Sequence, residues 1–424
     1  MTSTTSTDAP VPPSLTRITL TVFLPFAGGY FLSYFYRSVN AIIAPQLVSE
    51  IELDAGDLGL LTSAYFFAFA AIQLPLGVML DRFGPRRVQA ALLLCAAAGA
   101  FIFAIGETRM ILMLGRALIG LGVAGGLMAS FKAITLWYPQ ERWPLANGCF
   151  MAMGGLGAMA ATAPMELALT ITDWRGIFVG LAIATIVVSV IIFTMVPERN
   201  GQTPPAALRD QIKGVRKICT NSAFWRLAPL AMTTLAANMA IQTLWAGPWF
   251  RDVGGLDRDG VASGLFILAF TMTLGFVCTG MTADFLSRRG VSLKLITGCG
   301  LTLFLIAQAL VVFRADVTGI MIWVLFGLTM NVAVLIYPQL CAHFPLSHTG
   351  RVNTSVNLLV FGGVFATQYG MGEIIDLWPV GPNGAYEPEA YSAAFGAILA
   401  LQCLAFLWFL IPIGKPPQND SAST

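Results

Sequence analysis

The sequence has 424 residues, of which 56% are hydrophobic and only 11% are charged, and its mean hydropathy is +0.75. In soluble domains roughly a quarter of all residues are charged. This composition therefore excludes a soluble enzyme and predicts a chain solvated mainly by lipid. The net charge of +2 is uninformative by itself, and we expect no nucleic-acid partner. Seven cysteines occur singly, without the paired spacing of a disulfide or zinc framework. We therefore expect no metal and no cofactor.

Apolar runs of spanning length alternate with clusters of turn residues and charges along the chain. They lie near residues 18–44, 58–80, 88–106, 110–137, 146–171, 176–196, 224–250, 260–282, 291–313, 317–340, 353–377 and 391–413. The polar stretch 197–223 separates two sets of six. The sequence thus predicts an all-α integral membrane protein of twelve transmembrane helices in two pseudo-symmetric six-helix bundles, 15–196 and 224–413. Residues 1–14 and 414–424 are expected to be short disordered tails.

The lysines and arginines are distributed unevenly over the two sides that these helices define. If the N-terminus is cytoplasmic, sixteen fall in inside segments and five in outside segments. Cytoplasmic loops carry such an excess, so both termini are predicted to lie in the cytoplasm, in a multi-pass protein of the inner (plasma) membrane. The remaining three basic residues fall inside predicted helices: Arg37, Arg116 and Lys132. They are the most informative side chains of the sequence.

Two short motifs recur half a chain apart. The first is Gly77-x-x-x-Asp81-Arg82-x-Gly84-Pro85-Arg86-Arg87, and its second copy is Gly280-x-x-x-Asp284-x-x-x-Arg288-Arg289-Gly290. Tyr138-Pro139-Gln140 likewise recurs as Tyr337-Pro338-Gln339. Internal duplication of this kind is typical of transporters built from two related helical bundles.

Together with the six-plus-six layout and the basic linker, these motifs resemble the major facilitator superfamily over residues 15 to 415. Arg116-x-x-x-Gly120-x-Gly122 is similar to the fourth-helix motif of that superfamily, and Asp173-Trp174-Arg175 is similar to bacterial members with organic-anion or metabolite substrates. The resemblance implies a secondary transporter that works by alternating access. The glycine-proline motif of many drug exporters is not evident in helix 5, and we therefore favour import.

The duplicated loop is expected to form a cytoplasmic gate. Its residues are Gly77, Asp81, Arg82, Gly84, Arg86, Arg87, Asp284 and Arg288. Both aspartates follow helices, where they can accept hydrogen bonds from helix N-termini and from the following arginines and so latch the two bundles in one conformation. The alternative is that Arg86 and Arg87 act only as topology anchors.

Arg37 is the first candidate for substrate binding. It lies about 12 Å below the outer end of helix 1, where an arginine costs at least ~2.5–3.5 kcal/mol and requires a partner. Tyr30 and Tyr34 share its helical face. In superfamily members that carry organic anions, an arginine in this part of helix 1 binds a carboxylate. The alternative is that Arg37 pairs with an acid on another helix.

The other two intramembrane cations allow two interpretations each. Lys132 either faces the cavity and binds substrate or extends to the cytoplasmic headgroups, which its depth permits. Arg116 fits the structural or proton-coupling arginine of the resembled motif. Glu166, the one carboxylate well inside a helix of the first half, is a candidate proton carrier, since burial should raise its pKa. It could instead neutralise Arg37 or Arg116 in a static pair.

In the second half the polar groups inside helices are uncharged. Gln242 and Trp245 share a face of helix 7 with Asn238, and Asn357 lies in helix 11. Gln242, Trp245 and Asn357 are candidate substrate contacts, although hydrogen bonds between helices explain them about equally well.

The charges inside the membrane sum to a cationic cavity, because three basic groups oppose one deep carboxylate. A lipophilic cation would be repelled there, whereas a small organic anion or zwitterion would supply the missing counter-charge. We thus expect a small-molecule solute of that class as the substrate. The protein is expected to be a monomer, with H+ as the coupling ion. A multidrug exporter, a sugar carrier and a siderophore or chelator carrier remain alternatives.

Overall fold

The computed structural model describes residues 14–139, 142–198, 208–314, 320–345, 349–381 and 384–411. These residues are helical apart from short connections, and the β-bridge Val380–Tyr386 is isolated. The predicted tails, 1–14 and 414–424, lie outside this part of the chain except for Ser14, which caps the first helix. The all-helical fold class is thus confirmed.

The N-terminal half of the structure contains nine α-helices and a π-helical turn among its described residues. They are α1 (Leu15–Ile18), η1 (Thr19–Phe23), α2 (Leu24–Ser38), α3 (Asn40–Ile51), α4 (Ala55–Ile105), α5 (Arg109–Val123), α6 (Gly126–Trp137), α7 (Trp143–Ala160), α8 (Ala163–Ala168) and α9 (Trp174–Met195). The label α4 covers two helices that meet at a sharp turn at Gly84. The φ of 77° and ψ of 161° at this residue suit glycine. Helix α4 therefore holds the two predicted runs 58–80 and 88–106.

A linker helix and the C-terminal half follow. They are α10 (Leu208–Cys219), α11 (Ser222–Ala240), η3 (Ile241–Trp245), α12 (Ala246–Asp252), α13 (Arg258–Arg288), α14 (Leu293–Val312), α15 (Ile320–Thr329), η4 (Val332–Leu335), α16 (Ile336–Cys341), α17 (Thr349–Ile375) and α18 (Pro388–Leu410). The polar linker expected at 197–223 therefore contains a helix that the sequence analysis did not anticipate, α10.

Ten helical segments among the described residues are long and apolar enough to cross a membrane, and Leu145–Ala160 is a shorter apolar helix. One of the ten is the bent Ala55–Ile105. The set is consistent with the expected number of crossings. Large hydrophobic side chains remain exposed on the outside of the protein, as a lipid-facing surface requires.

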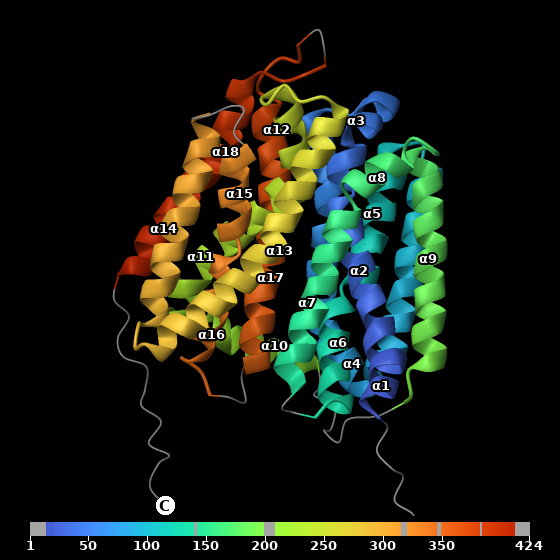
Figure 1. The fold of residues 1–424 in the computed structure, drawn as a ribbon, viewed down its shortest axis with the longest axis vertical. Coiled ribbons are helices and arrows are strands. Elements are labelled where there is room, and N and C mark those ends of the chain that lie inside the picture. Colours follow the sequence, from blue (N-terminus) through green and yellow to red (C-terminus); the bar gives the residue numbers. More distant parts are fainter. Residues whose placement is uncertain are drawn as a thin grey trace, which may run out of the picture.

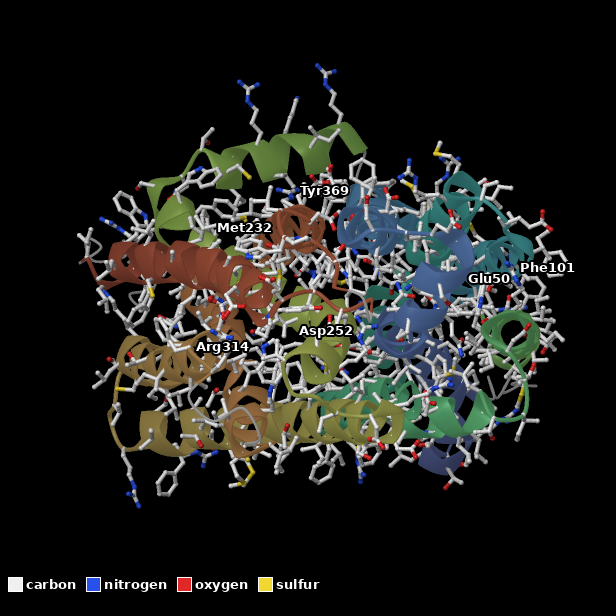
Figure 2. All side chains as sticks on the ribbon, turned by 90° about the horizontal axis from the view of Figure 1, so that it is seen from above. Glu50, Phe101, Met232, Asp252, Arg314 and Tyr369 are labelled. Atoms are coloured by element: carbon white, nitrogen blue, oxygen red, sulfur yellow. The ribbon has the colours of Figure 1, made fainter. Side chains whose placement is uncertain are left out.

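The two halves of the sequence lie side by side, and both α1 and the end of α13 lie toward the same end of the molecule (Figure 1). We call this end the terminal face; it includes Leu15, the turn at Gly84 and Arg288. The opposite end, with Ile51, Asp252 and Ile375, is called the distal face. Figure 2 looks onto the distal face, with the C-terminal half on the left and the N-terminal half on the right.

Two pairs of helices form the largest contacts between the halves. Helix α4 packs extensively on α17, and α7 packs on α13. At the second crossing Gly155 lies against Thr273, because a methyl group at Gly155 would come within 2.4 Å of the Thr273 hydroxyl oxygen. This close approach fixes the two halves against each other near the middle of α7 and α13.

Besides the run near 146–171, which breaks at Ala161, four expected helices are interrupted along their length. The run near 18–44 breaks at Val39 and continues to Ile51, the run near 110–137 breaks between α5 and α6, η3 interrupts the seventh, and η4 interrupts the tenth. By order along the chain these are the first, fourth, seventh and tenth apolar runs, two equivalent pairs in the two halves. Breaks at equivalent places in two repeats are typical of the substrate region of transporters.

Candidate functional site

Arg37 lies where three helices of the two halves meet. It is on α2 and is 7% exposed. Its guanidinium carbon lies 4.6 Å from the ring centre of Tyr34, 5.4 Å from that of Phe69 on α4 and 5.8 Å from that of Phe361 on α17. These three rings form an aromatic cage around Arg37. Because Phe361 belongs to the C-terminal half, the cage depends on how the halves are arranged.

No carboxylate in the described part of the chain forms an ion pair with Arg37. Its Nε atom is buried without a hydrogen-bond partner among those residues. Cation–π contacts contribute about 0.5–2 kcal/mol and leave the charge in place. The alternative, in which an acid on another helix neutralises Arg37, is therefore not found in the structure.

The tyrosines expected beside Arg37 extend this site along α2. Tyr30 and Tyr34 stack edge to face with ring centres 5.1 Å apart, and Tyr30 also packs on Phe150 of α7 at 4.8 Å. The Tyr30 hydroxyl points to the sulfur of Met151 at 3.5 Å. The aromatic stripe on α2 thus faces the interior of the N-terminal half.

Arg116 supports α2 from behind. It is 1% exposed, and its Nη1 donates to the carbonyl of Tyr36 at 3.1 Å. Tyr36 precedes Arg37 and lies three residues before the break at Val39, so Arg116 stabilises the segment that presents Arg37. No ion pair among the described residues includes Arg116.

Side chains from neighbouring helices bind the backbone at the breaks. The Ser33 hydroxyl donates to the carbonyl of Val123, the last residue of α5, at 3.4 Å. In the other half, the Asn238 amide donates to the carbonyl of Met330 beside the break before η4. Irregular backbone at membrane depth needs such partners. Ser33 and Asn238 occupy equivalent roles on the first helices of the two halves.

The second-half candidates are dispersed around this region. Gln242 lies in η3, which contacts α2, and is mostly buried. Asn357 lies one turn before Phe361 and accepts a hydrogen bond from the Tyr337 hydroxyl at 2.7 Å. Trp245 is 1% exposed and its indole N–H donates to the carbonyl of Gln368 at 3.2 Å. In this conformation Trp245 thus packs inside the C-terminal half and is not part of the aromatic cage around Arg37.

Lys132 does not join Arg37. Its Nζ donates to the Asp81 carboxylate at 2.7 Å, so it neutralises the gate motif from α6. Both expected readings of Lys132, cavity residue and headgroup-bound lysine, are replaced by this pair. Its two members are about a quarter to a third exposed (27% and 31%) and belong to the same half.

The other gate residues also bond within their own halves. Arg87 pairs with Glu198 at 2.6 Å, and Arg86 lies 4.9 Å from the ring of Phe193. Arg82 lies over Phe83, its neighbour. In the second copy, Arg288 pairs with Asp284 one helical turn away at 2.9 Å. Among the described residues, no ion pair at the terminal face joins the two halves.

Glu166 lies nearer the distal face than expected. The predicted run 146–171 breaks at Ala161, and Glu166 falls in the short helix α8 that follows. Its carboxylate pairs with Arg258, at the start of α13 in the other half. The alternative of a static pair with Arg37 or Arg116 is therefore not found in the structure, because the Glu166 carboxylate pairs with Arg258 instead.

A second polar contact joins the halves at the distal face. The Asp376 carboxylate, at the end of α17, accepts from the backbone N–H groups of Ala55 (3.0 Å) and Gly56 at the start of α4. The Tyr386 hydroxyl donates to Asp376 at 2.5 Å and lies 3.2 Å from the Ala55 nitrogen. A carboxylate at a helix N-terminus is favoured by both hydrogen bonding and the helix dipole. One half therefore caps a helix of the other.

A third contact lies one step deeper. The Gln368 side chain on α17 donates to the Thr62 hydroxyl on α4 at 3.0 Å. In the described residues, every side-chain hydrogen bond or ion pair between the halves lies between the distal face and this level. This arrangement is closed at its distal face.

Sequence reasoning missed the aromatic cage and the distal contacts. Tyr65 and Phe69, one turn apart on α4, were a detectable signal, because aromatic residues at that spacing form one helical face. Nothing in the sequence indicates that Phe361, Asp376 or Arg258 meet residues of the other half. No cluster of metal-ligating side chains occurs among the residues that the structure describes.

The chain is similar to known membrane transporters along nearly its whole length. It is 24% identical over 414 residues to the "Uncharacterized transporter YybO" of Bacillus subtilis, covering 90% of this chain and 92% of that protein. It is 24% identical over 418 residues to the "Probable sulfoacetate transporter SauU" of Cupriavidus necator, covering 92% and 94%. The fold matches a bacterial homologue of the human lysosomal transporter Spinster, in an inward-facing and unoccupied conformation, with a TM-score of 0.75 at 16% identity, covering 94% of this chain and 97% of that one.

A family model described as Major Facilitator Superfamily matches residues 26–368. That range includes Arg37, both loop motifs and the interruptions of the first, fourth, seventh and tenth apolar runs. The chain therefore belongs to the major facilitator superfamily and is a multi-pass membrane transporter of small-molecule solutes, not an enzyme.

Proposed function

We propose that this protein takes up a small organic anion through the inner (plasma) membrane by alternating access, coupled to H+. The observation that carries the proposal is the buried, unpaired charge of Arg37 at the junction of the two halves. The proposed architecture is twelve transmembrane helices in two six-helix bundles, 15–196 and 224–413, joined by a linker at 197–223. Both termini, and hence the terminal face, are cytoplasmic.

Arg37 favours a substrate with a carboxylate or sulfonate group. A guanidinium presents a planar set of donors that matches two oxygens of one anionic group. A buried arginine without a counter-ion is costly, so an anion that enters the site recovers this cost. The similarity to a relative named as a sulfoacetate transporter supports the same substrate class.

The aromatic cage links substrate binding to the movement of the halves. Tyr34 and Phe69 belong to the N-terminal half, whereas Phe361 belongs to the other. An anion that binds Arg37 competes with these rings for its charge and changes the contact with Phe361. Ligands shift a conformational equilibrium only through such differential contacts. Gln242 and Asn357 are then proposed to contact the rest of the substrate from the C-terminal half.

Proton coupling is proposed to act through the distal pair of Glu166 and Arg258. A proton that binds Glu166 removes the attraction to Arg258 across the halves and so favours opening of the distal face. Arg116 holds the backbone beside Arg37 and is proposed to relate the two events. In Glu166→Gln we expect substrate exchange to continue while uptake driven by a pH gradient is lost. Uptake that still follows the gradient would remove Glu166 from the coupling mechanism.

The substrate class can be tested by thermal stabilisation of the purified protein. We expect small carboxylates or sulfonates, with sulfoacetate as the first probe, to raise Tm in the wild type and not in Arg37→Ala. Arg37→Lys should retain weak binding, because it keeps the charge and loses the bidentate geometry. Hydrogen bonds between charged partners contribute about 1.5–3 kcal/mol, so affinity should fall at least ~10-fold in Arg37→Ala.

Two controls accompany this test. The uncharged amide of each probe anion should not raise the Tm of the wild type. The Arg226→Ala variant, which neutralises an arginine at the terminal face, should be stabilised by the anion as the wild type is. Stabilisation by lipophilic cations that survives in Arg37→Ala would favour the alternative of a multidrug exporter. Stabilisation by a ferric chelator in the wild type alone would favour a siderophore carrier.

A further inference from the structure

An apolar groove runs along the outside of the C-terminal half, away from the contact between the halves. It has a volume of ≈ 600 Å³ and lies between α11, α17 and α18. It begins at Cys219 and Trp225 near the terminal face and ends at Ile374 toward the distal face. Figure 2 labels Met232, which lines the groove, on the side of the molecule that α10 crosses.

The floor of this groove is made of small residues. Gly362 and Gly370 of α17 line it, and a methyl group at either position would meet no protein atom within 4 Å. From Ser355 to Ile374 the helix rises about 28 Å. The groove is thus narrow, long and open to the lipid, a shape that fits an acyl chain.

Helix α10 places a cationic surface at the terminal end of the groove. Gly214 and Ile218 form its buried face, and Gly214 lies against the Arg351 side chain of α17. The opposite face is exposed and carries four cations: Arg209, Lys213, Arg216 and Lys217. None of the four forms an ion pair within the described part of the chain.

Two tryptophans indicate the depth of α10 in the bilayer. The Trp225 indole N–H donates to the carbonyl of Cys219, the last residue of α10, at 2.6 Å, and the Trp408 indole N–H donates to the carbonyl of Trp225 at 2.9 Å. Both rings are about half exposed (48% each). Exposed tryptophans of this kind lie at the level of lipid headgroups. Helix α10 is joined to them and therefore lies at that level.

We propose that the groove and α10 together bind one anionic phospholipid from the leaflet at the terminal face. Its acyl chain lies in the groove, and its phosphate contacts the cationic face of α10 near Arg216 and Lys217. Basic sites of this kind between membrane helices recognise anionic headgroups. Since α10 packs on both α17 and α4, the bound lipid touches a helix that bridges the two halves.

The dimensions specify which part of the groove the lipid fills. One leaflet contributes about half of a ~30 Å hydrocarbon core, or ~15 Å. Gly362 lies seven residues beyond Ser355, about 10 Å along the helix, and falls within that distance. Gly370, about 22 Å along, falls beyond it. A bulky side chain at Gly362 should therefore displace the acyl chain.

The test uses the full-length protein in detergent with equal amounts of phosphatidylglycerol and phosphatidylcholine, and native mass spectrometry reports the retained lipid. The wild type should retain phosphatidylglycerol preferentially. Neutralising α10 with Arg209→Gln, Lys213→Gln, Arg216→Gln and Lys217→Gln should lower this preference about fivefold for each charge that contacts the headgroup. Gly362→Leu should reduce retention of both lipids.

Matched controls carry the same chemistry elsewhere. Arg17→Gln with Arg289→Gln neutralises exposed cations elsewhere at the terminal face, and Gly298→Leu adds bulk at an α14 glycine that also has open space around it. Both should behave as wild type, and unfolding curves should show that all variants are folded. If the controls lower retention as much as the α10 and Gly362 variants, the lipid is annular only and the site is refuted. Unchanged retention in the α10 and Gly362 variants would refute it equally.

Discussion

The two ends of the contact between the halves use their charged residues in opposite ways. At the distal face, Asp376 and Glu166 bond across the halves, to the start of α4 and to Arg258. At the terminal face, Asp81 and Asp284 bond within their own halves, to Lys132 and Arg288. Separation of the distal ends must break the first set and leaves the second intact. The repeated motif of the sequence is therefore not what holds this conformation.

This difference fits the two tasks of the alternating access proposed above. A closed end needs bonds that can be broken by moving one half, and these are expected between the halves. At an open end, each carboxylate still needs a counter-ion where it lies against a low-dielectric surface. Ion pairs formed within one half provide this counter-ion without joining the halves. A latch formed by the gate motif is then expected only in the opposite conformation.

The largest effect is predicted for Asp376→Ala. The substitution removes the acceptor of two backbone N–H groups of α4 and of the Tyr386 hydroxyl. Hydrogen bonds to a charged group contribute about 1.5–3 kcal/mol, so the equilibrium should shift ~10-fold or more toward opening of the distal face. Distances between spin labels at Ser49 and Leu256, in a background without native cysteines, would measure this shift.

Asp57→Ala is the matched control for Asp376→Ala. Asp57 is in the first turn of α4 and pairs with Arg109 of the same half. Its loss should leave the label distance unchanged. An equal shift in both variants would mean that the stability of the α4 terminus matters and the contact between the halves does not.

Glu166→Gln should have a smaller effect. Arg258 is 60% exposed, so solvent and salt weaken its pair with Glu166. We expect a two- to fivefold shift toward distal opening, about the range of exposed ion pairs, and a smaller shift at high salt. The exchanged pair Glu166→Arg with Arg258→Glu should restore the wild-type distance, whereas Glu50→Gln, which breaks a pair with Arg175 inside one half, should not alter it.

Asp81→Asn should leave the distal labels at their closed distance, because its pair with Lys132 lies within one half. Uptake should nevertheless fall if Asp81 latches the halves in the opposite conformation. Lys132→Met removes the same pair and keeps the carboxylate, so it should retain more uptake than Asp81→Asn. An equal loss of uptake in both variants would mean that the motif only stabilises its own half. Opening of the distal face in either variant would contradict the difference between the two faces described above.

The smallest effect concerns pH. Loss of solvent at the distal face, and then the nearby Asp376 carboxylate, raise the pKa of Asp54 above its ordinary value. The closed arrangement thus binds this proton more tightly than an open one. Acidification should favour closure through Asp54, and this contribution is lost as pH rises through the raised pKa. Label distances measured against pH in a Glu166→Gln background should show this dependence, and Asp54→Asn should abolish it.

Much of the fold followed from the sequence because a bilayer imposes strong local rules. Every segment that crosses it needs a long apolar run, so the runs alone located the helices. Period and depth also located Arg37, Tyr30 and Tyr34 on one face of α2, where Arg37 and Tyr30 are buried and Tyr34 is partly buried. The interrupted runs were less predictable, because a break such as that at Ala161 depends on neighbours that supply its hydrogen bonds.

What only the tertiary structure decided is which charges meet. The sequence placed Lys132 and Glu166 in the membrane, and helical period gave the face of each helix but not the helix that the face touches. Asp81 and Lys132 are 51 residues apart, and Asp376 lies 320 residues from Gly56. Partners this distant in the chain are selected by packing of the two halves, and packing leaves no local pattern. The sequence therefore determined a membrane transporter with surplus positive charge, and the tertiary structure decided that this charge remains on Arg37 and Arg116, which form no ion pair among the described residues.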